Sequence, residues 1–168
     1  LDASLAEKAI GILSTDVADD FRNDLRILAF KAFGQDCAYY PDSTPFLFDK
    51  QNVRDGHYPI WGPIHFYTRV NGGIPTTQSG ELVTRFAAPK LSDELVTAIV
   101  SKHLVPKCAM HVDRSTEMGA LKSYTTESRC DCFFQKSVSG MTTCQACTNS
   151  AECPASAPAC SYGYCETP

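Results

Sequence analysis

Residues 130–168 read CDCFFQKSVSGMTTCQACTNSAECPASAPACSYGYCETP, and this stretch decides the kind of fold that the chain adopts. Seven of the nine cysteines fall in these last 39 residues. Dense cysteine in a segment with little apolar periodicity is typical of disulfides that take the place of a hydrophobic core. Structural disulfides persist in oxidising compartments, so the sequence predicts a secreted protein of the periplasm or the extracellular space.

All nine cysteines are candidates for disulfide bonds, and their odd number leaves one thiol free or paired with another chain. The spacing leaves the connectivity open. Cys130-x-Cys132 and Cys144-x-x-Cys147 would also supply four zinc ligands, but Cys-x-Cys is tight for one structural zinc and the compartment favours disulfides. We therefore expect no metal and no cofactor. The candidates are Cys37, Cys108, Cys130, Cys132, Cys144, Cys147, Cys153, Cys160 and Cys165.

The sequence before the cysteine-rich segment begins with a strand pattern and a helix pattern. Residues 9–13 (Ala-Ile-Gly-Ile-Leu) form a short apolar run that predicts a buried strand. Apolar residues then recur at helical spacing over residues 16–33, after Ser14 as a possible N-cap and before Gly34 as the stop. This order predicts one strand followed directly by one helix.

Further along, the chain contains a second strand pattern and a second helix pattern. Residues 63–70 are rich in strand-forming side chains and end in the turn Asn71-Gly72-Gly73. Residues 91–104 predict a helix that Ser92 caps, and residues 110–114 predict a short final strand. We expect an α/β region over residues 1–129 and a small disulfide-stapled module over residues 130–168.

Two of these stretches resemble phosphate-type periplasmic substrate-binding proteins. AIGILS at residues 9–14 resembles the AIGYVS strand of that family, and VRDGHYPI at residues 53–60, followed by Gly-Pro-Ile-His-Phe-Tyr-Thr-Arg-Val, resembles its Tyr-Pro return strand. The helix over residues 91–104 takes the matching place. The resemblance covers residues 5 to about 105 and implies part of a two-lobed, type 2 α/β fold whose hinge contains Tyr58-Pro59.

The departures from that family concern its ligand-binding residues. The sequence contains no Arg-x-x-x-Ser-Gly-Thr run, and Trp61-Gly62-Pro63-Ile64 stands where the family has Arg-Pro-Leu. The resemblance therefore implies the fold without phosphate specificity. The chain begins at Leu1 rather than Met, and we expect an N-terminal half outside this numbering, or another chain, to complete the cleft. The tail resembles small disulfide modules attached to bacterial surface proteins.

The candidate ligand-binding residues are Ser14, Thr15 and Asp16, at the start of the first predicted helix. Ligands of open α/β folds lie at the carboxyl ends of strands, where helix N-termini bind anions. An ordinary N-cap accounts for the same residues, and Asp16 would repel an anion. Arg54 and Asp55 predict a surface ion pair of little energy, and His57 is a loop residue that would also suit the cleft.

Composition excludes several classes of function. A net charge of −4 argues against nucleic acid, because phosphate binding needs a basic face. No apolar run approaches the roughly 20 residues that span a bilayer, so we do not expect a transmembrane protein. The spacing of serine, histidine and glycine matches none of the common hydrolase or nucleotide-binding motifs, and we expect no enzyme.

Two functions fit these observations. The first is a solute-binding-like protein of the cell envelope or extracellular space that holds a small anionic solute in an interlobe cleft. The second is a structural or accessory subunit of a surface assembly that keeps the fold without transport. The missing oxyanion motif and the cysteine-rich appendage favour the second function, and the ordered strand, helix and Tyr-Pro pattern favours the first.

Overall fold

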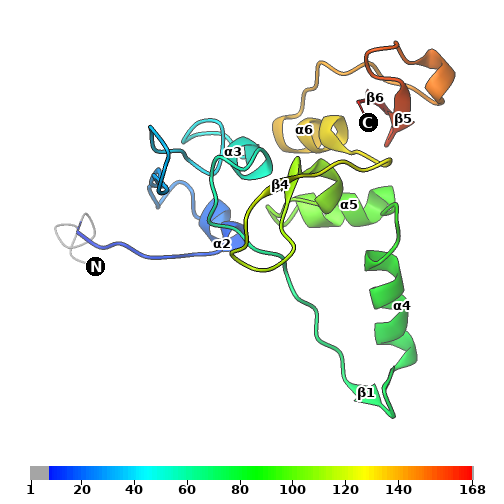
Figure 1. Cartoon of the computed structure of the whole chain (residues 1–168), viewed down its shortest axis with the longest axis horizontal. Coiled ribbons are helices and arrows are strands. Elements are labelled where there is room, and N and C mark those ends of the chain that lie inside the picture. The colour runs from blue at the N-terminus through cyan, green and yellow to red at the C-terminus, as the bar shows by residue number, and fades with distance from the viewer. Residues whose placement is uncertain (1–7, 168) are drawn as a thin grey trace.

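The computed structural model describes residues 8–167, which form short helices and three small antiparallel sheets (Figure 1). The α-helices are α2 (Thr15–Asp20), α3 (Gln51–Arg54), α4 (Thr77–Phe86), α5 (Asp93–Val100) and α6 (Asp131–Ser139), and the 3₁₀ helices are η1 (Lys107–Ala109) and η2 (Ser150–Glu152). The sheets pair β1 (Val70–Asn71) with β2 (Ile74–Pro75), β3 (Val112–Asp113) with β4 (Lys122–Ser123), and β5 (Ala159–Ser161) with β6 (Tyr164–Glu166).

The hydrophobic core lies between α5, η1, α6 and the β5–β6 hairpin. Val96 and Val100 of α5 are one helical turn apart and both are buried, so α5 presents one apolar face. Phe134 of α6 is 1% exposed and packs in the same cluster. Burying a side chain of this size stabilises a fold by about 1.5–3 kcal/mol. The other buried members are Cys108, Ala109, Cys130 and Tyr162.

Four disulfides hold this core together. Cys108–Cys130 joins η1 to the start of α6, and the other three lie within the cysteine-rich segment. Closing loops of 12 to 22 residues stabilises a chain by roughly 3 kcal/mol for each bond. Cys37 is the one free cysteine, and it is exposed. The remaining pairs are Cys132–Cys144, Cys147–Cys160 and Cys153–Cys165.

The core continues across residue 129. The Cys108–Cys130 bond and the packing of α5 against α6 both join the cysteine-rich segment to the residues before it. Tyr162 adds a third connection, since its hydroxyl donates to the Leu91 carbonyl at 2.9 Å. Whether residues 1–129 and 130–168 fold as separate units stays a prediction, but their described parts share one apolar interior.

The N-terminal part is held by ion pairs rather than by a core. Lys50 is 2% exposed, and its Nζ lies 2.5 Å from Asp19 Oδ2 and 2.8 Å from Asp42 Oδ1. Arg22 pairs with the same two carboxylates and stacks on the Phe48 ring. Two cations and two anions balance each other here, which satisfies charges that would be costly to bury singly. This cluster fixes α2 against the loop that leads into α3.

The predicted strand at residues 9–13 is wrong. Its backbone has no strand partner, and Ile10 and Ile12 are 84% and 96% exposed. A strand needs a neighbouring edge for its N–H and C=O groups. The three sheets of the described chain pair β1 with β2, β3 with β4 and β5 with β6, and residues 9–13 join none of them.

The predicted helix over residues 16–33 forms only as α2, followed by turns at residues 21–24. Asp19 and Arg22 are drawn into the ion-pair cluster, and Phe30 exchanges two backbone hydrogen bonds with Tyr39. An extended bridge of that kind is incompatible with helical backbone at Phe30. The strand pattern over residues 63–70 likewise shortens to β1, because β2 offers only two residues for pairing.

Several other local predictions are confirmed. The Ser92 side chain accepts the Leu95 N–H at the start of α5, as the capping pattern indicates. Gly72 and Gly73 form the β1–β2 turn with φ of 60° and 83°, and β3 lies within the last predicted strand. The two-lobed arrangement is not seen among residues 8–167. What the structure shows is the coarser class of mixed helices and small sheets with four disulfides toward the C-terminus.

Replacing Phe134 with alanine tests the location of the core. We expect Phe134→Ala to lower the free energy of unfolding by about 3–5 kcal/mol, because it removes a ring from a closed interior. The matched control is Phe33→Ala, whose ring is 108% exposed and should change stability by less than about 0.5 kcal/mol. Urea denaturation of the oxidised proteins measures both. Equal effects would place the core elsewhere.

Candidate functional site

A pocket of about 490 Å³ lies beside the start of α6, next to β6 and the loops that precede and follow η2. It gathers more ionisable side chains than the second pocket, of about 290 Å³, which lies between α5, α6 and Phe48. Concave sites that collect titratable groups are the usual places for ligands. Polar side chains in its wall are His111, Asp131, Thr143, Gln145, Glu166 and Thr167.

His111 is held on both sides by carboxylates. Its Nδ1 lies 2.5 Å from Asp55 Oδ1, and its Nε2 lies 3.0 Å from both oxygens of Asp131. The hydrogen bond with Asp131 is the main cause that raises the pKa of His111 above its usual range, although burial opposes it. Two carboxylate partners favour the imidazolium, in which both ring nitrogens donate.

Asp131 connects this histidine to two arginines. The carboxylate accepts from Arg54 and, at 3.0 Å, from Arg129 Nη1. Burial is the largest single influence on Asp131 and works to raise its pKa, but His111, Arg54 and Arg129 together outweigh it, so the pKa lies below the usual value. Asp131 is also the first residue of α6, where the helix dipole favours a negative charge.

The surface ion pair predicted between Arg54 and Asp55 is wrong. Arg54 is fully buried, its Nε donates to the Ala109 carbonyl at 2.8 Å, and its guanidinium stacks on the Phe134 ring. Neighbouring residues at the end of the short helix α3 point different ways, so Asp55 turns to His111 while Arg54 reaches Asp131. The pair that forms spans 77 residues of sequence, which local spacing does not reveal.

Glu166 provides a second titratable group in the pocket. It is 3% exposed, and its Oε1 accepts the Cys132 N–H at 2.8 Å, at the N-terminus of α6. Burial raises the pKa of Glu166 from 4.5 to about 7, and the negative charge of Asp131 adds to the effect. Near neutral pH this carboxyl group therefore exists in both protonation states, so it can donate or accept a hydrogen bond.

His111 is poorly placed to act as a general base. A general base needs a free nitrogen within reach of the proton that it removes. Both nitrogens of His111 are occupied by carboxylates, so it has none to offer Thr143 or Thr167. The pocket presents fixed hydrogen-bonding groups together with Glu166, whose raised pKa of about 7 lets it gain or lose a proton near neutral pH.

The predicted ligand-binding residues lie away from this pocket. Ser14 is exposed at the start of α2 and makes no capping bond through its side chain, while Thr15 and Asp16 are half-buried. The side chain of Ser14 is the main cause that lowers the pKa of Asp16. None of the three lines either described pocket, and their role in binding stays a prediction. His57 stacks on Tyr39, with ring centroids 5.0 Å apart.

Sequence reasoning did not find His111, Asp131 or Glu166 as a group. The contacts that unite them span 20 residues for His111 with Asp131 and 34 for Glu166 with Cys132. The one available signal is the charged pattern Arg129-Cys130-Asp131-Cys132, which places ionisable side chains between two disulfide positions.

Comparison with known proteins returns no family model that matches this chain and no match among curated proteins or solved structures. In residues 8–167, no helix is both long and apolar enough to cross a bilayer.

The pH dependence of stability tests the protonation of Glu166. Its pKa is raised on folding, so the stabilisation is complete below about pH 4.5 and is lost as pH rises through about 7. His111 has the same sign and adds to the loss above its unfolded pKa. We expect the free energy of unfolding to fall from pH 5 to pH 8, with on the order of 3 kcal/mol attributable to Glu166.

Glu166→Gln keeps the acceptor for Cys132 and removes the titration, so it should flatten this slope between pH 5 and pH 7. The control is Glu127→Gln, which changes an exposed carboxylate. Guanidinium denaturation at each pH provides the free energies. A slope that Glu166→Gln leaves intact would contradict the raised pKa.

Proposed function

We propose that this chain is a non-catalytic component of the cell envelope or extracellular space that resembles solute-binding proteins in sequence. We also propose that its N-terminal part associates with a second polypeptide. The role supported best is that of an accessory subunit, and binding of a small solute is the second candidate. Four disulfides are compatible with an oxidising location of this kind.

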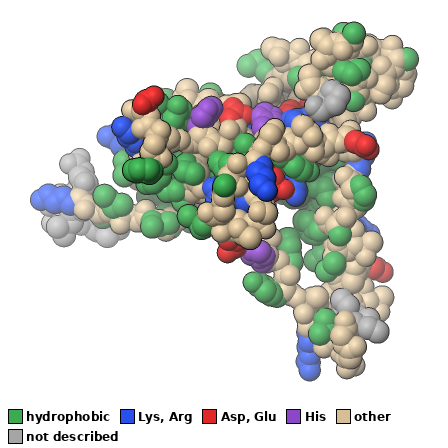
Figure 2. All heavy atoms as spheres, in the orientation of Figure 1, with side chains coloured by type: hydrophobic (Ala, Val, Ile, Leu, Met, Phe, Trp, Pro, Cys, Tyr) green, Lys and Arg blue, Asp and Glu red, His purple; other side chains and the backbone are tan. Residues whose placement is uncertain are grey.

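The observation that carries the accessory role is the distribution of apolar surface. Among the side chains that the structure describes, eighteen of the twenty large apolar ones that are exposed lie between residues 10 and 83, whereas most buried apolar residues lie between 96 and 165. Figure 2 shows apolar side chains spread over the visible face of the molecule in this part. Apolar side chains that are exposed in this number and concentrated in one part of a chain favour an interaction site there.

Fifteen of these eighteen residues come from two regions of the fold, and the other three are Phe46, Leu47 and Ile60. One is the segment from residue 10 to residue 33, and the other is an arm, residues 64–90, that projects from the rest of the molecule with β1 and α4 (Figure 1). Within the arm, Phe66 packs on Phe86 with ring centroids 4.7 Å apart, but α4 buries none of its residues. An amphipathic helix without a covered face is stabilised by docking its apolar side on a partner.

Cys37 lies in this same N-terminal part. It is exposed, and it is the cysteine that remains unpaired because four intramolecular disulfides join the other eight. In an oxidising compartment such a thiol supports a covalent bond to the associated chain. The partner is either the N-terminal half of the same two-lobed scaffold or another chain.

The solute-binding role is favoured by the His111–Asp131–Glu166 pocket and by the resemblance of residues 9–14 and 53–70 to substrate-binding proteins. Under this proposal, Ser14, Thr15 and Asp16 contact a small anionic solute in a cleft that the partner completes, and the pocket beside α6 is a separate polar site.

Substitutions in the exposed apolar surface test the accessory role. The uncovered surface of the isolated chain should bind a hydrophobic dye and cause concentration-dependent self-association. We expect Phe33→Ser with Phe66→Ser to reduce both effects at least twofold, whereas the control Met118→Ser, at an exposed position outside this surface, should not. Light scattering with size-exclusion chromatography gives the mass. A strict monomer without dye binding, identical in all variants, would count against association through this surface.

Calorimetric titration tests the solute-binding role. The wild-type chain is titrated with inorganic oxyanions and with small polyols at pH 6 and pH 8. Binding in the pocket should change with pH and be weakened roughly tenfold by Glu166→Gln, because the pocket would lose its adjustable proton. Flat titrations throughout would remove solute binding in the pocket beside α6 and leave the accessory role untouched.

A further inference from the structure

The pocket beside α6 contains one buried carboxyl group with an acceptor to spare. Glu166 is 3% exposed and lines the pocket, and its Oε1 accepts the Cys132 N–H at 2.8 Å. Its Oε2 has no hydrogen-bond partner within residues 8–167. A buried carboxylate is costly unless donors satisfy both of its oxygens. The second oxygen of Glu166 can therefore accept a hydrogen bond from a molecule in the pocket.

The other polar side chains of the wall add acceptors rather than free cationic donors. Thr143 and Thr167 contribute hydroxyls, and Gln145 offers its Oε1, since its Nε2 already donates to the Glu152 carbonyl at 2.6 Å. Both ring nitrogens of His111 are taken by carboxylates. A hydroxyl can accept or donate, whereas an amide or carboxylate oxygen only accepts. The wall thus suits a ligand that brings its own donors.

The charges around Glu166 favour a positive ligand over a negative one. Burial is the main cause that raises the pKa of Glu166 to about 7, Asp131 adds to it, and Arg129 and Arg54 oppose it. Both arginines and His111 are already paired with Asp131. When Glu166 is ionised, three carboxylates balance three cations, because His111 has a second carboxylate partner. A cation beside Glu166 would take the place of the proton that burial otherwise favours.

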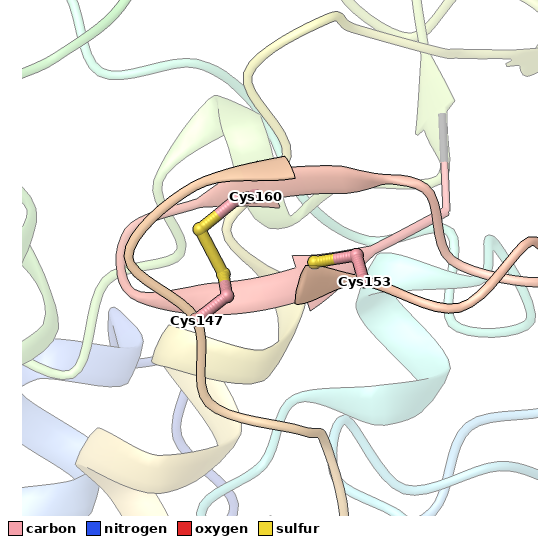
Figure 3. Close-up of side chains that lie close together, drawn as sticks. All are labelled: Cys147, Cys153 and Cys160. Carbon is pink, nitrogen blue, oxygen red and sulfur yellow. A yellow bond between two sulfur atoms is a disulfide. The ribbon is translucent and has the colours of Figure 1, made fainter. Parts of the chain in front are cut away.

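The wall of the pocket is cross-linked, so its shape is largely preformed. Cys165 in the wall is bonded to Cys153, whose sulfur lies beside the Cys147–Cys160 bond (Figure 3). The sulfurs of Cys147, Cys153 and Cys160 lie within 4.8 Å of one another, so these two disulfides pack together. A third disulfide of the wall joins α6 to the loop after it. Preformed sites lose less conformational freedom when a ligand binds.

An ammonium group matches this wall, because it carries a positive charge, three donors and no acceptor. Pro154 and Ala157 supply apolar surface in the same pocket, on which a short alkyl stem can lie. We propose that the pocket beside α6 binds small aliphatic ammonium compounds, whose head donates to Glu166 Oε2 and whose stem contacts Pro154 and Ala157. Binding of this kind rests on the solute-binding role proposed above and specifies the solute of this pocket.

Three probes with one four-carbon stem and different heads test the proposal. Butylammonium, 1-butanol and butyrate are each titrated into the oxidised full-length chain at pH 8, and nuclear magnetic resonance follows the Cys132 amide that donates to Glu166. We expect butylammonium to bind at least tenfold more tightly than either other probe, because charge-assisted hydrogen bonds are about twice as strong as neutral ones.

The affinity for butylammonium should also rise about tenfold from pH 6 to pH 8. Glu166, with a pKa of about 7, is mostly protonated at the lower pH and mostly ionised at the higher one, while the amine keeps its charge. Loss of the His111 proton over the same range removes a positive charge and acts in the same direction.

Two variants locate the site, each with a matched control. Glu166→Gln keeps an acceptor for Cys132 and should weaken butylammonium at least tenfold and abolish the pH dependence, whereas Glu127→Gln, at an exposed carboxylate, should not. Thr143→Lys places a competing ammonium at an exposed position of the wall and should weaken binding at least fivefold. Its control is Thr125→Lys, at an exposed position outside the pocket.

Each outcome of these titrations supports or overturns ammonium binding. Butyrate or 1-butanol that binds as tightly as butylammonium overturns it and leaves solute binding in the pocket standing. Equal weakening by Thr143→Lys and Thr125→Lys overturns the location, and this pair decides even where Glu166→Gln fails to fold. If no probe shifts a signal, ammonium binding is overturned, and the calorimetric titrations with oxyanions and polyols decide separately whether the pocket binds another solute.

Discussion

The ion pair between Arg54 and Asp131 is the interaction on which the arrangement of this molecule depends. Arg54 is fully buried, and a charge in that position is tolerated only with a partner and further hydrogen bonds. Asp131 supplies the charge, the Ala109 carbonyl accepts from Nε, and the Phe134 ring lies under the guanidinium. Removing one partner of such a pair typically destabilises a protein by about 3–5 kcal/mol. The bond therefore determines where α6, and with it the cysteine-rich segment, sits against α3.

The same carboxylate sets the chemistry of the pocket. Asp131 favours the charged form of His111, and its negative charge disfavours ionisation of Glu166. One residue at the start of α6 thus affects two neighbouring groups, favouring the charged form of His111 and the neutral form of Glu166. The pocket therefore forms where α6 meets the parts of the chain that carry His111 and Glu166. A ligand bound there would contact the residues that join these parts.

Local features of this fold follow from the sequence, and the long-range ones do not. The Ser92 cap, the Gly72-Gly73 turn and the disulfide character of the tail depend on neighbouring residues and are predictable. The extended, unpaired conformation of residues 9–13 is not predictable from local sequence, since an apolar run becomes a strand only where another strand pairs with it. The pocket depends on contacts between residues 20 to 77 positions apart, and helix α6 lacks apolar periodicity because buried cysteines take part of its inner face.

The contrast between the two parts of the chain has a physical origin in how each offsets the conformational entropy that is lost on folding. The C-terminal part combines cross-links with a small core, so a few buried side chains such as Val96 and Phe134 suffice there. The N-terminal part has neither cross-links nor a comparable core, and its ion-pair cluster around Lys50 orders only α2 and the following loop. Apolar side chains that remain exposed gain little from their own chain, and burying them would contribute about 25 cal/mol per Å², which is the driving force that the proposed association would use.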